Sequence, residues 1–274
     1  MEGSYQINPR GNNIFFKLNL TLQLIILNVF FYIVSLIILG VYGETFFSTN
    51  LALNPAYILN GEKIWTIFTS IFVHGSFFHL FANMFSLFFI GNFLEKLIGR
   101  KRFLWVYLIS GLVGGLFFIF FSVLFGNPDV FAVGASGAIF GLLGVLALLV
   151  PHSKIYLIVG PLLLIVAEVV LTDFLPGSIL PLFSFIVNIL FIAMIFSLLF
   201  PVSPILRKLS LPLQLSMWML PFVAIIPLSI ISLFVPLPIG NSAHFGGLVV
   251  GLIYGFYLRK KFPNKTKRIS KLFS

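Results

Sequence analysis

Long apolar runs, each about as long as a lipid bilayer is thick, constrain this chain more than any other feature. We place eight of them at about residues 18–40, 75–94, 103–125, 134–150, 155–172, 181–200, 212–235 and 242–258, each bounded by charge, glycine or proline. A helix needs about 20 apolar residues to cross the hydrocarbon core of a membrane. The sequence therefore predicts an all-α polytopic membrane protein with about eight transmembrane helices.

Composition supports a single membrane domain. Hydrophobic residues make up 59% of the chain and charged residues only 9%, whereas soluble domains carry about 25% charged residues. No small-residue cleavage site follows the first apolar run, so we expect it to be a retained span and not a signal peptide. The predicted organisation is an N-terminal tail (1–17), a transmembrane domain (18–258) and a basic C-terminal tail (259–274).

The basic residues predict how the chain crosses the membrane. If the N-terminus is cytoplasmic, every lysine and arginine except Lys63 falls in an inner segment, as expected for cytoplasmic loops. Both tails are then cytoplasmic, and we expect an integral protein of the plasma membrane. The formal charge of +10 is explained by this topology and by attraction of the basic tail to anionic lipid headgroups. It does not indicate a nucleic-acid partner.

A few polar residues interrupt the apolar runs, and the topology places them at one depth. Ser136 lies in GASG at the start of the fourth run, His79 and Asn83 lie one helical turn apart in the second, and His244 begins the eighth. All three runs point inward, so these side chains share the outer half of the membrane. Buried polar groups there are costly and usually functional; the alternative is that they hydrogen-bond one another between helices.

Ser136 and His244 form the simplest nucleophile and base pair that the chain offers. A neutral imidazole activates a serine hydroxyl by accepting its proton, and the acyl transfer that follows needs donors for the developing oxyanion. Asn83, the His79 ring and the Ser136 backbone N–H are candidates. No carboxylate neighbours His244 in the sequence, which favours a dyad over a triad. The absence of cysteine excludes disulfides, cysteine metal sites and a thiol nucleophile.

Glycine spacing supplies a way for the two helices to approach each other. Stripes without side chains occur in the fourth run (Gly134, Gly137, Gly141 and Gly144) and in the eighth (Gly247, Gly251 and Gly255). Such stripes allow helix axes to pack closely. They also occur in ordinary membrane bundles, so by themselves they do not distinguish packing from function.

Several motifs in this order resemble the rhomboid family of intramembrane serine proteases. They are HLFAN with the preceding His74, EKLIG at Glu95, GASG around Ser136 and AHFGGLVVG around His244, and the likeness covers most of residues 62–175 and 240–258. The resemblance implies a six-helix core that cleaves other membrane proteins within or beside their transmembrane helices, with no metal and no cofactor. The partners would be transmembrane protein substrates and the lipid bilayer; the sequence makes no prediction of the oligomeric state.

The resemblance also implies a role for each matching residue. Ser136 would be the nucleophile and His244 the base. His79, Asn83 and the Ser136 backbone N–H would form the oxyanion hole, and the supporting residues would be His74, Gly134, Gly137 and Phe140.

The sequence departs from the family pattern in three places. Trp65 is followed by threonine where the family often has arginine, and Phe140 stands where many members have a tyrosine stacked on the catalytic histidine. Three apolar runs separate Ser136 from His244 where the core has one. Residues 154–174 look most like the fifth core helix, so we expect residues 176–239 to be an inserted helical hairpin. Two added spans preserve the direction of the last helix.

Two other functional classes remain open. A catalytically inactive rhomboid-like protein would bind transmembrane helices without cleaving them, but it would usually have lost the serine or the histidine. A transporter would explain the many spans and an intramembrane Glu168, yet the sequence shows no internal repeat. Activity toward a fluorophosphonate or a model transmembrane substrate separates these classes from a protease.

Overall fold

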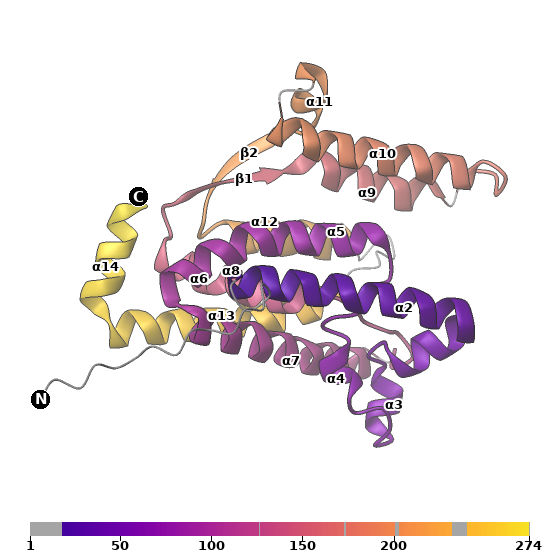
Figure 1. Ribbon diagram of the computed structural model, residues 1–274, viewed down its shortest axis with the longest axis horizontal. Coiled ribbons are helices and arrows are strands. Elements are labelled where there is room, and N and C mark those ends of the chain that lie inside the picture. The colour runs from indigo at the N-terminus through magenta and orange to yellow at the C-terminus, as the bar shows by residue number, and fades with distance from the viewer. Residues whose placement is uncertain (1–17, 126, 173, 201–202, 232–239, 274) are drawn as a thin grey trace, which may run out of the picture.

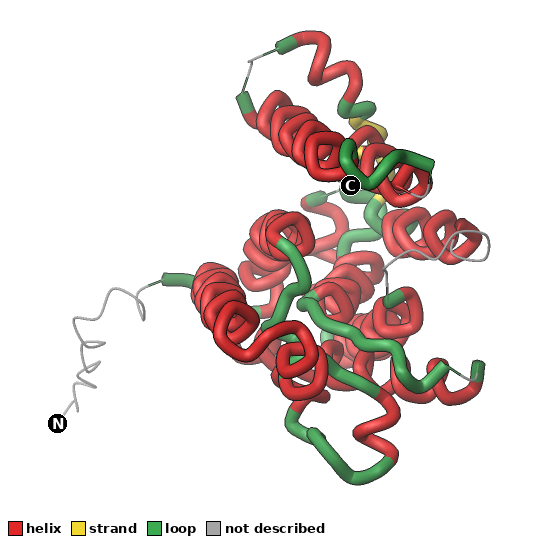
Figure 2. The backbone as a smooth tube through the Cα atoms, turned by 90° about the vertical axis from the view of Figure 1, so that its right-hand side faces the viewer, coloured by secondary structure: helices red, strands yellow, loops and turns green. Residues whose placement is uncertain are grey.

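The structure is a computed structural model that describes residues 18–125, 127–172, 174–200, 203–231 and 240–273. Figure 2 shows that this part of the chain is mostly helical, with loops between the helices and two short strands. The predicted N-terminal tail (1–17) lies outside the described residues. The mostly helical architecture confirms the predicted fold class.

The helices follow one another along the chain, joined mostly by short loops (Figure 1). They are α2 (Leu20–Asn50), α3 (Pro55–Leu59), α4 (Thr66–Thr69), α5 (Phe77–Ser86), η1 (Leu87–Gly91), α6 (Asn92–Ile98), α7 (Arg100–Leu124), α8 (Ser136–Leu149), α9 (Val159–Thr172), α10 (Leu180–Leu199), α11 (Pro204–Leu209), α12 (Leu220–Ile231), α13 (Asn241–Lys261) and α14 (Pro263–Leu272). Two strands, β1 (Lys154–Ile158) and β2 (Pro212–Ser216), interrupt this order.

Four helices of the described chain are long and apolar enough to cross a membrane. They span Leu20–Asn50, Phe77–Ile98, Arg100–Leu124 and Leu180–Ser197, and they identify an integral, polytopic membrane protein. Helix α8 has only 14 residues, or about 21 Å at 1.5 Å per residue, which is shorter than the hydrocarbon core of about 30 Å. The count of eight transmembrane helices stays a prediction.

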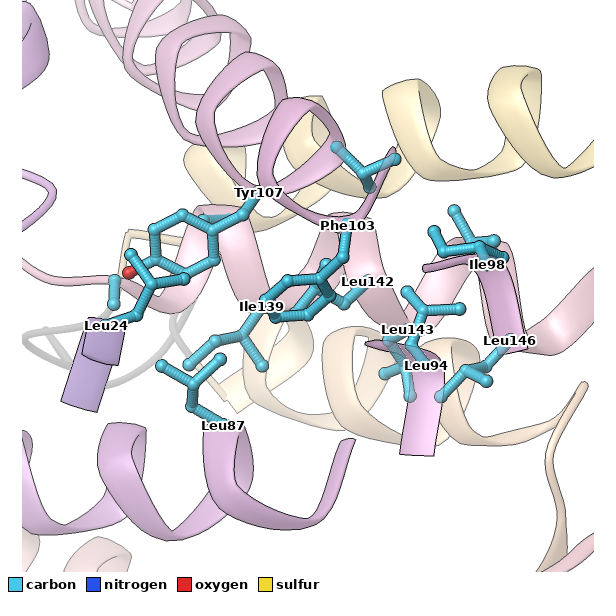
Figure 3. Packing of buried hydrophobic residues seen from close by; sticks show 14 of the residues in the cluster. Leu24, Leu87, Leu94, Ile98, Phe103, Tyr107, Ile139, Leu142, Leu143 and Leu146 are labelled. Carbon is cyan, nitrogen blue, oxygen red and sulfur yellow. The ribbon is translucent and has the colours of Figure 1, made fainter. Parts of the chain in front are cut away.

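Helices α7, α8 and α13 form the centre of the bundle, and the two predicted glycine stripes face each other there. A Cβ atom on Gly247 would collide with the carbonyl oxygen of Gly137, and one on Gly251 with that of Gly141. The absence of side chains therefore lets the α8 and α13 backbones touch. Around this contact, large side chains from α5 to α8 interlock, including Leu87, Phe103, Tyr107, Ile139 and Leu142 (Figure 3).

The carboxylate of Glu95 fixes the start of α2 to the end of α6. One of its oxygens accepts a hydrogen bond of 2.8 Å from the Leu20 N–H, and the other accepts two of 2.8 Å from the Thr21 N–H and hydroxyl. The first N–H groups of a helix have no intrahelical acceptor, and a negative charge there opposes the helix dipole. Both carboxylate oxygens of the buried Glu95 therefore accept hydrogen bonds.

The region between α8 and α13 differs from the predicted hairpin over 176–239. Strands β1 and β2 pair antiparallel, from Lys154 with Ser216 to Ile158 with Pro212, so the predicted starts of helical spans at 155 and 212 are wrong. The paired strands enclose residues 159–211. An apolar run such as KIYLI has no periodicity that separates a strand from a buried helix, and its β-branched and aromatic residues favour the strand.

Packing then assigns the surrounding helices differently from the sequence analysis. Helix α9 packs against α10, whereas α12 packs against α8 and α13. Figure 1 shows α9, α10 and α11 as a layer outside the bundle and α12 within it. This outer layer contacts α5 through Phe191 of α10, whose ring lies 5.8 Å from that of Phe78 and 6.1 Å from that of Phe81. Helix α12, and not α9, therefore packs directly against α8 and α13.

The predicted basic tail (259–274) is helical over most of its length. Helix α13 continues to Lys261, and α14 follows from Pro263 to Leu272. Thr266 is buried, and Ile269 packs against the main apolar cluster. The sequence analysis considered only the charges of this tail and did not predict that Thr266 and Ile269 would pack against the bundle.

Candidate active site

Ser136 and His244 lie in hydrogen-bond contact although they are 108 positions apart in the sequence. Ser136 is the first residue of α8, and His244 lies in the first turns of α13. The Ser136 hydroxyl oxygen is 2.7 Å from Nε2 of His244. Because the glycine stripes bring the two helices together, short side chains can span the gap between them.

The ring of Phe140 packs flat on the imidazole of His244. The ring centroids are 4.4 Å apart and the planes differ by 14°. Phe140 follows Ser136 by four residues and so lies on the same face of α8. The aromatic surface fixes the plane of the imidazole, a contact that needs no phenol hydroxyl.

The second ring nitrogen of His244 has no partner in the described part of the chain. His244 is buried, and its Nδ1 makes no hydrogen bond with any described residue. The described residues also contain no group of three His, Asp or Glu side chains that could hold a metal ion. The observed contact is therefore a pair, Ser136 with His244, whose orientation comes from packing on Phe140.

His79 and Asn83 lie together on α5 and face the same site. Ser76 caps this helix by accepting a hydrogen bond of 3.2 Å from the His79 N–H, which fixes the first turn. The side-chain amide of Asn83 donates a hydrogen bond of 2.8 Å to the His79 carbonyl. An amide carries two donors, so one N–H remains for another acceptor.

Gly134 brings the strand-like segment before α8 against the His79 ring. Its N–H donates a hydrogen bond of 2.8 Å to the Ser70 carbonyl, and its φ of +119° lies in a region that favours glycine. A Cβ atom there would lie 2.7 Å from Cε1 and Nε2 of His79. Glycine is therefore required both by the backbone and by the neighbouring ring.

These groups line one cavity of about 860 Å³. Its walls include Ser136, His79, Asn83, Gly134, Gly137, Phe140 and His244, all of them predicted from the sequence. The backbone N–H of Ser136 belongs to the first turn of α8, where N–H groups have no intrahelical acceptor. Potential donors and a hydroxyl paired with an imidazole thus face a common space.

His74 supports this wall without lining the cavity. Its side chain is 1% exposed, and its ring meets that of His79 edge-on, with centroids 5.1 Å apart. His79 therefore packs against the His74 ring as well as against Gly134. A supporting role for His74 in the site stays a prediction.

Sequence reasoning missed the part of the site that α7 provides. Gly111 and Gly115 line the cavity, and a Cβ atom on Gly114 would lie 2.8 Å from the Ala243 carbonyl and 3.6 Å from Cα of Gly137. Helix α7 thus touches both helices of the Ser136–His244 pair. The glycine cluster at 111–115 was the available signal. Ala82 and Ser86, which line the cavity on α5, were also missed because small residues at helical spacing are common.

The bundle and this site define a helical membrane protein with a paired serine and histidine in the wall of a cavity. A model of the Rhomboid domain matches residues 61–203, which is more than half of the chain, and the chain therefore belongs to the rhomboid family. The match contains His79, Asn83 and Ser136 and ends before His244.

Individual relatives match shorter segments. The chain is similar to RHOMBOID-like protein 1 of Arabidopsis thaliana, with 44% identity over 93 residues, 34% of this chain and 23% of that protein. Rhomboid protein 1, mitochondrial, of Saccharomyces cerevisiae is 39% identical over 97 residues, 35% of this chain and 28% of the relative. Inactive RHOMBOID-like protein 8 of Arabidopsis thaliana is 37% identical over 87 residues, 32% of this chain and 23% of the relative. The chain thus spans less than a third of each of these relatives.

Proposed function

We propose that this protein is a serine endopeptidase that cleaves transmembrane segments of other membrane proteins through a Ser136–His244 dyad. The observation that carries the proposal is the 2.7 Å contact between the Ser136 hydroxyl and His244 Nε2. Membership in rhomboid, a family of intramembrane serine proteases, supports it.

The proposed reaction follows from the positions of these groups. Ser136 Oγ forms a bond to the peptide carbonyl carbon while its proton moves to His244 Nε2. Collapse of the tetrahedral intermediate breaks the peptide C–N bond, and His244 returns the proton to the leaving amine. Water, deprotonated by the same imidazole, then hydrolyses the acyl-enzyme.

Stabilisation of the oxyanion falls to the donors around the cavity. The Asn83 amide, the His79 ring and the Ser136 backbone N–H would face the negative oxygen of the intermediate. Fixed donors in a site shielded from water stabilise such a charge more than donors in bulk solvent do. His74, Gly134, Gly137 and Phe140 would hold the two histidines and the serine in place.

The substrates and the membrane setting are part of the proposal. The cavity lies among apolar helices, so the fitting substrates are transmembrane proteins whose unwound segment reaches Ser136. We assign the site to the outer half of the plasma membrane and both termini to the cytoplasm, because the basic residues gather at the opposite end of the bundle.

A second candidate is a rhomboid-like protein that binds membrane helices without cleaving them. The similarity to a relative named inactive favours it. The intact serine and histidine and their direct contact argue for catalysis instead.

The test compares wild type, Ser136→Ala and His244→Ala in detergent. We expect a fluorophosphonate to label wild type only, and each substitution to abolish cleavage of a model transmembrane substrate, because nucleophile and base act as a unit. Thermal unfolding of each variant serves as the folding control. Equal turnover by wild type and folded Ser136→Ala would refute the dyad, and a folded wild type with neither labelling nor cleavage would support the binding protein.

A further inference from the structure

One end of the bundle is densely cationic. We define the basic end as the exposed lysines and arginines where α6 ends, α7 begins, α13 ends and α14 lies: Lys96, Arg100, Lys101, Arg102, Arg259, Lys260, Lys261, Lys265, Lys267, Arg268 and Lys271. Among described residues, the carboxylate at this end is Glu95, which is buried and bonded to the start of α2. The exposed side chains that the structure describes at the basic end therefore include no negative charge.

Helix α14 presents two different faces at this end. Thr266 is buried, Ile269 packs on the main apolar cluster, and the ring of Phe273 lies 5.0 Å from that of Phe93 on α6. The exposed face carries Lys265, Lys267, Arg268 and Lys271. Figure 1 shows that α14 turns sharply away from α13 and runs across the end of the bundle. A helix with this distribution suits the interface between a membrane and water.

Two cations from different helices converge beside α14. The Arg102 guanidinium lies 5.1 Å from the centroid of the Phe262 ring, and the Lys261 ammonium lies 5.9 Å from the same centroid. The ammonium also donates a hydrogen bond of 2.7 Å to the Tyr257 hydroxyl. Both cations thus lie beside the Phe262 ring, at the junction of α13 and α14, where their charge attracts a phosphate group.

The position of the basic end along the bundle matches a membrane surface. Within α13, the rise from His244 to Lys261 at its end is about 25 Å at 1.5 Å per residue. This is close to the roughly 30 Å thickness of the hydrocarbon core. Because the helices between are apolar, the basic end falls in the layer of lipid headgroups.

We propose that the basic end binds the phosphate headgroups of anionic phospholipids, with α14 lying in the headgroup layer. Arg102 and Lys261 form its inner part, and the exposed face of α14 forms its outer part. The proposal goes beyond the general attraction of a basic tail to a membrane, because it requires a folded helix and a defined set of cations. It does not depend on proteolytic activity.

The experiment uses the full chain with one added cysteine, Leu272→Cys, on the exposed side of α14. A coumarin attached to this cysteine reports energy transfer from phospholipids that carry a nitrobenzoxadiazole group on the acyl chain. Labelled phosphatidylglycerol and phosphatidylcholine, added to the protein in maltoside micelles, then differ only in the headgroup. We expect half-saturation with phosphatidylglycerol at a concentration at least ~10-fold lower, and a weaker preference at high salt.

Paired charge substitutions locate the effect. Each basic residue near an anionic surface strengthens binding about fivefold, so Lys267→Gln with Arg268→Gln should weaken phosphatidylglycerol binding by about 10-fold or more. Lys154→Gln with Lys208→Gln removes the same charge from exposed residues outside the basic end. This control should change the half-saturation less than twofold.

Three results would overturn the proposal. One is equal half-saturation of wild type by the two lipids. Another is an equal loss in the control pair, which would show a response to net charge and not to this surface. The third is full displacement of phosphatidylglycerol by millimolar inorganic phosphate, which would show a site for small anions.

Discussion

Gly134 is the residue at which backbone and site constrain each other most directly. Its φ of +119° and the 2.7 Å between a Cβ atom and the His79 ring make separate demands for glycine. The backbone demand can be tested apart from the contact with His79. Gly61 also has a positive φ, of 75°, but no atom lies within 4 Å of its Cβ position.

We predict that Gly134→Ala lowers the turnover of a transmembrane substrate by about 10²-fold or more, since displacing His79 removes an oxyanion donor. Gly61→Ala also places an alanine at positive φ and should leave turnover within about twofold in a folded protein. The measurement is kcat with a purified model substrate. Equal rates for the two variants would show that the contact with His79 has no catalytic consequence.

His79→Ala and Asn83→Ala should each slow cleavage without stopping it. Loss of one oxyanion donor typically costs about 10²- to 10³-fold in rate. The effect should fall on kcat and leave KM nearly unchanged, because the donors act on charge that develops in the transition state. Fluorophosphonate labelling together with steady-state kinetics gives the measurement, and an unchanged kcat in both variants would contradict this oxyanion hole.

At the scale of elements, the contact between Glu95 and α2 holds the first long helix to the bundle. Glu95→Gln keeps the size of the side chain but removes the charge and replaces one acceptor by a donor facing Thr21. Hydrogen bonds to charged groups contribute about 1.5–3 kcal/mol, so we predict a loss of about 2 kcal/mol in the free energy of unfolding. Reversible unfolding in mixed micelles measures it.

Glu62→Gln is the matched control, because Glu62 is exposed in a loop. It should leave the free energy of unfolding within about 0.5 kcal/mol of wild type, as is usual for surface substitutions. If Glu95→Gln is as stable as this control, Glu95 does not anchor α2.

Sequence reasoning was most successful where chemistry and spacing coincide. Ser136, His244, His79 and Asn83 were unusual polar residues in apolar runs, and the structure brings all four to one cavity. It failed at KIYLI and at Pro212, where hydrophobicity alone does not separate strand from helix. The packing of α12 on α8 was also hidden, because which of two similar apolar runs completes a bundle depends on contacts far apart in the sequence.

At the scale of the whole molecule, the direction of α10 decides the topology. Gly177 lies in the loop before α10, and Lys208 lies in α11 after it, both exposed. We predict that single cysteines at these two positions react with a membrane-impermeant reagent from opposite sides of the membrane, outside for 177 and inside for 208. The chain has no cysteine of its own, so any label reports only the introduced position.

Cysteine at Gly61, a second exposed loop position, provides the reference for the outer side in intact cells or sealed vesicles. Cysteines at positions 61 and 177 should both be labelled by the impermeant reagent from the outer side. Labelling of 177 and 208 from the same side would contradict a transmembrane α10 and the eight-span topology.

The β1–β2 ribbon makes residues 159–211 an insertion whose two ends lie side by side. Ile158 and Pro212 are directly paired, and paired antiparallel residues have Cα atoms about 5 Å apart. The chain leaves and re-enters the bundle at nearly one point, so the path from α8 to α12 is continuous without the segment between them. A lineage could gain, lose or exchange such a segment at the modest entropy cost of closing a loop, while the Ser136–His244 geometry stayed the same.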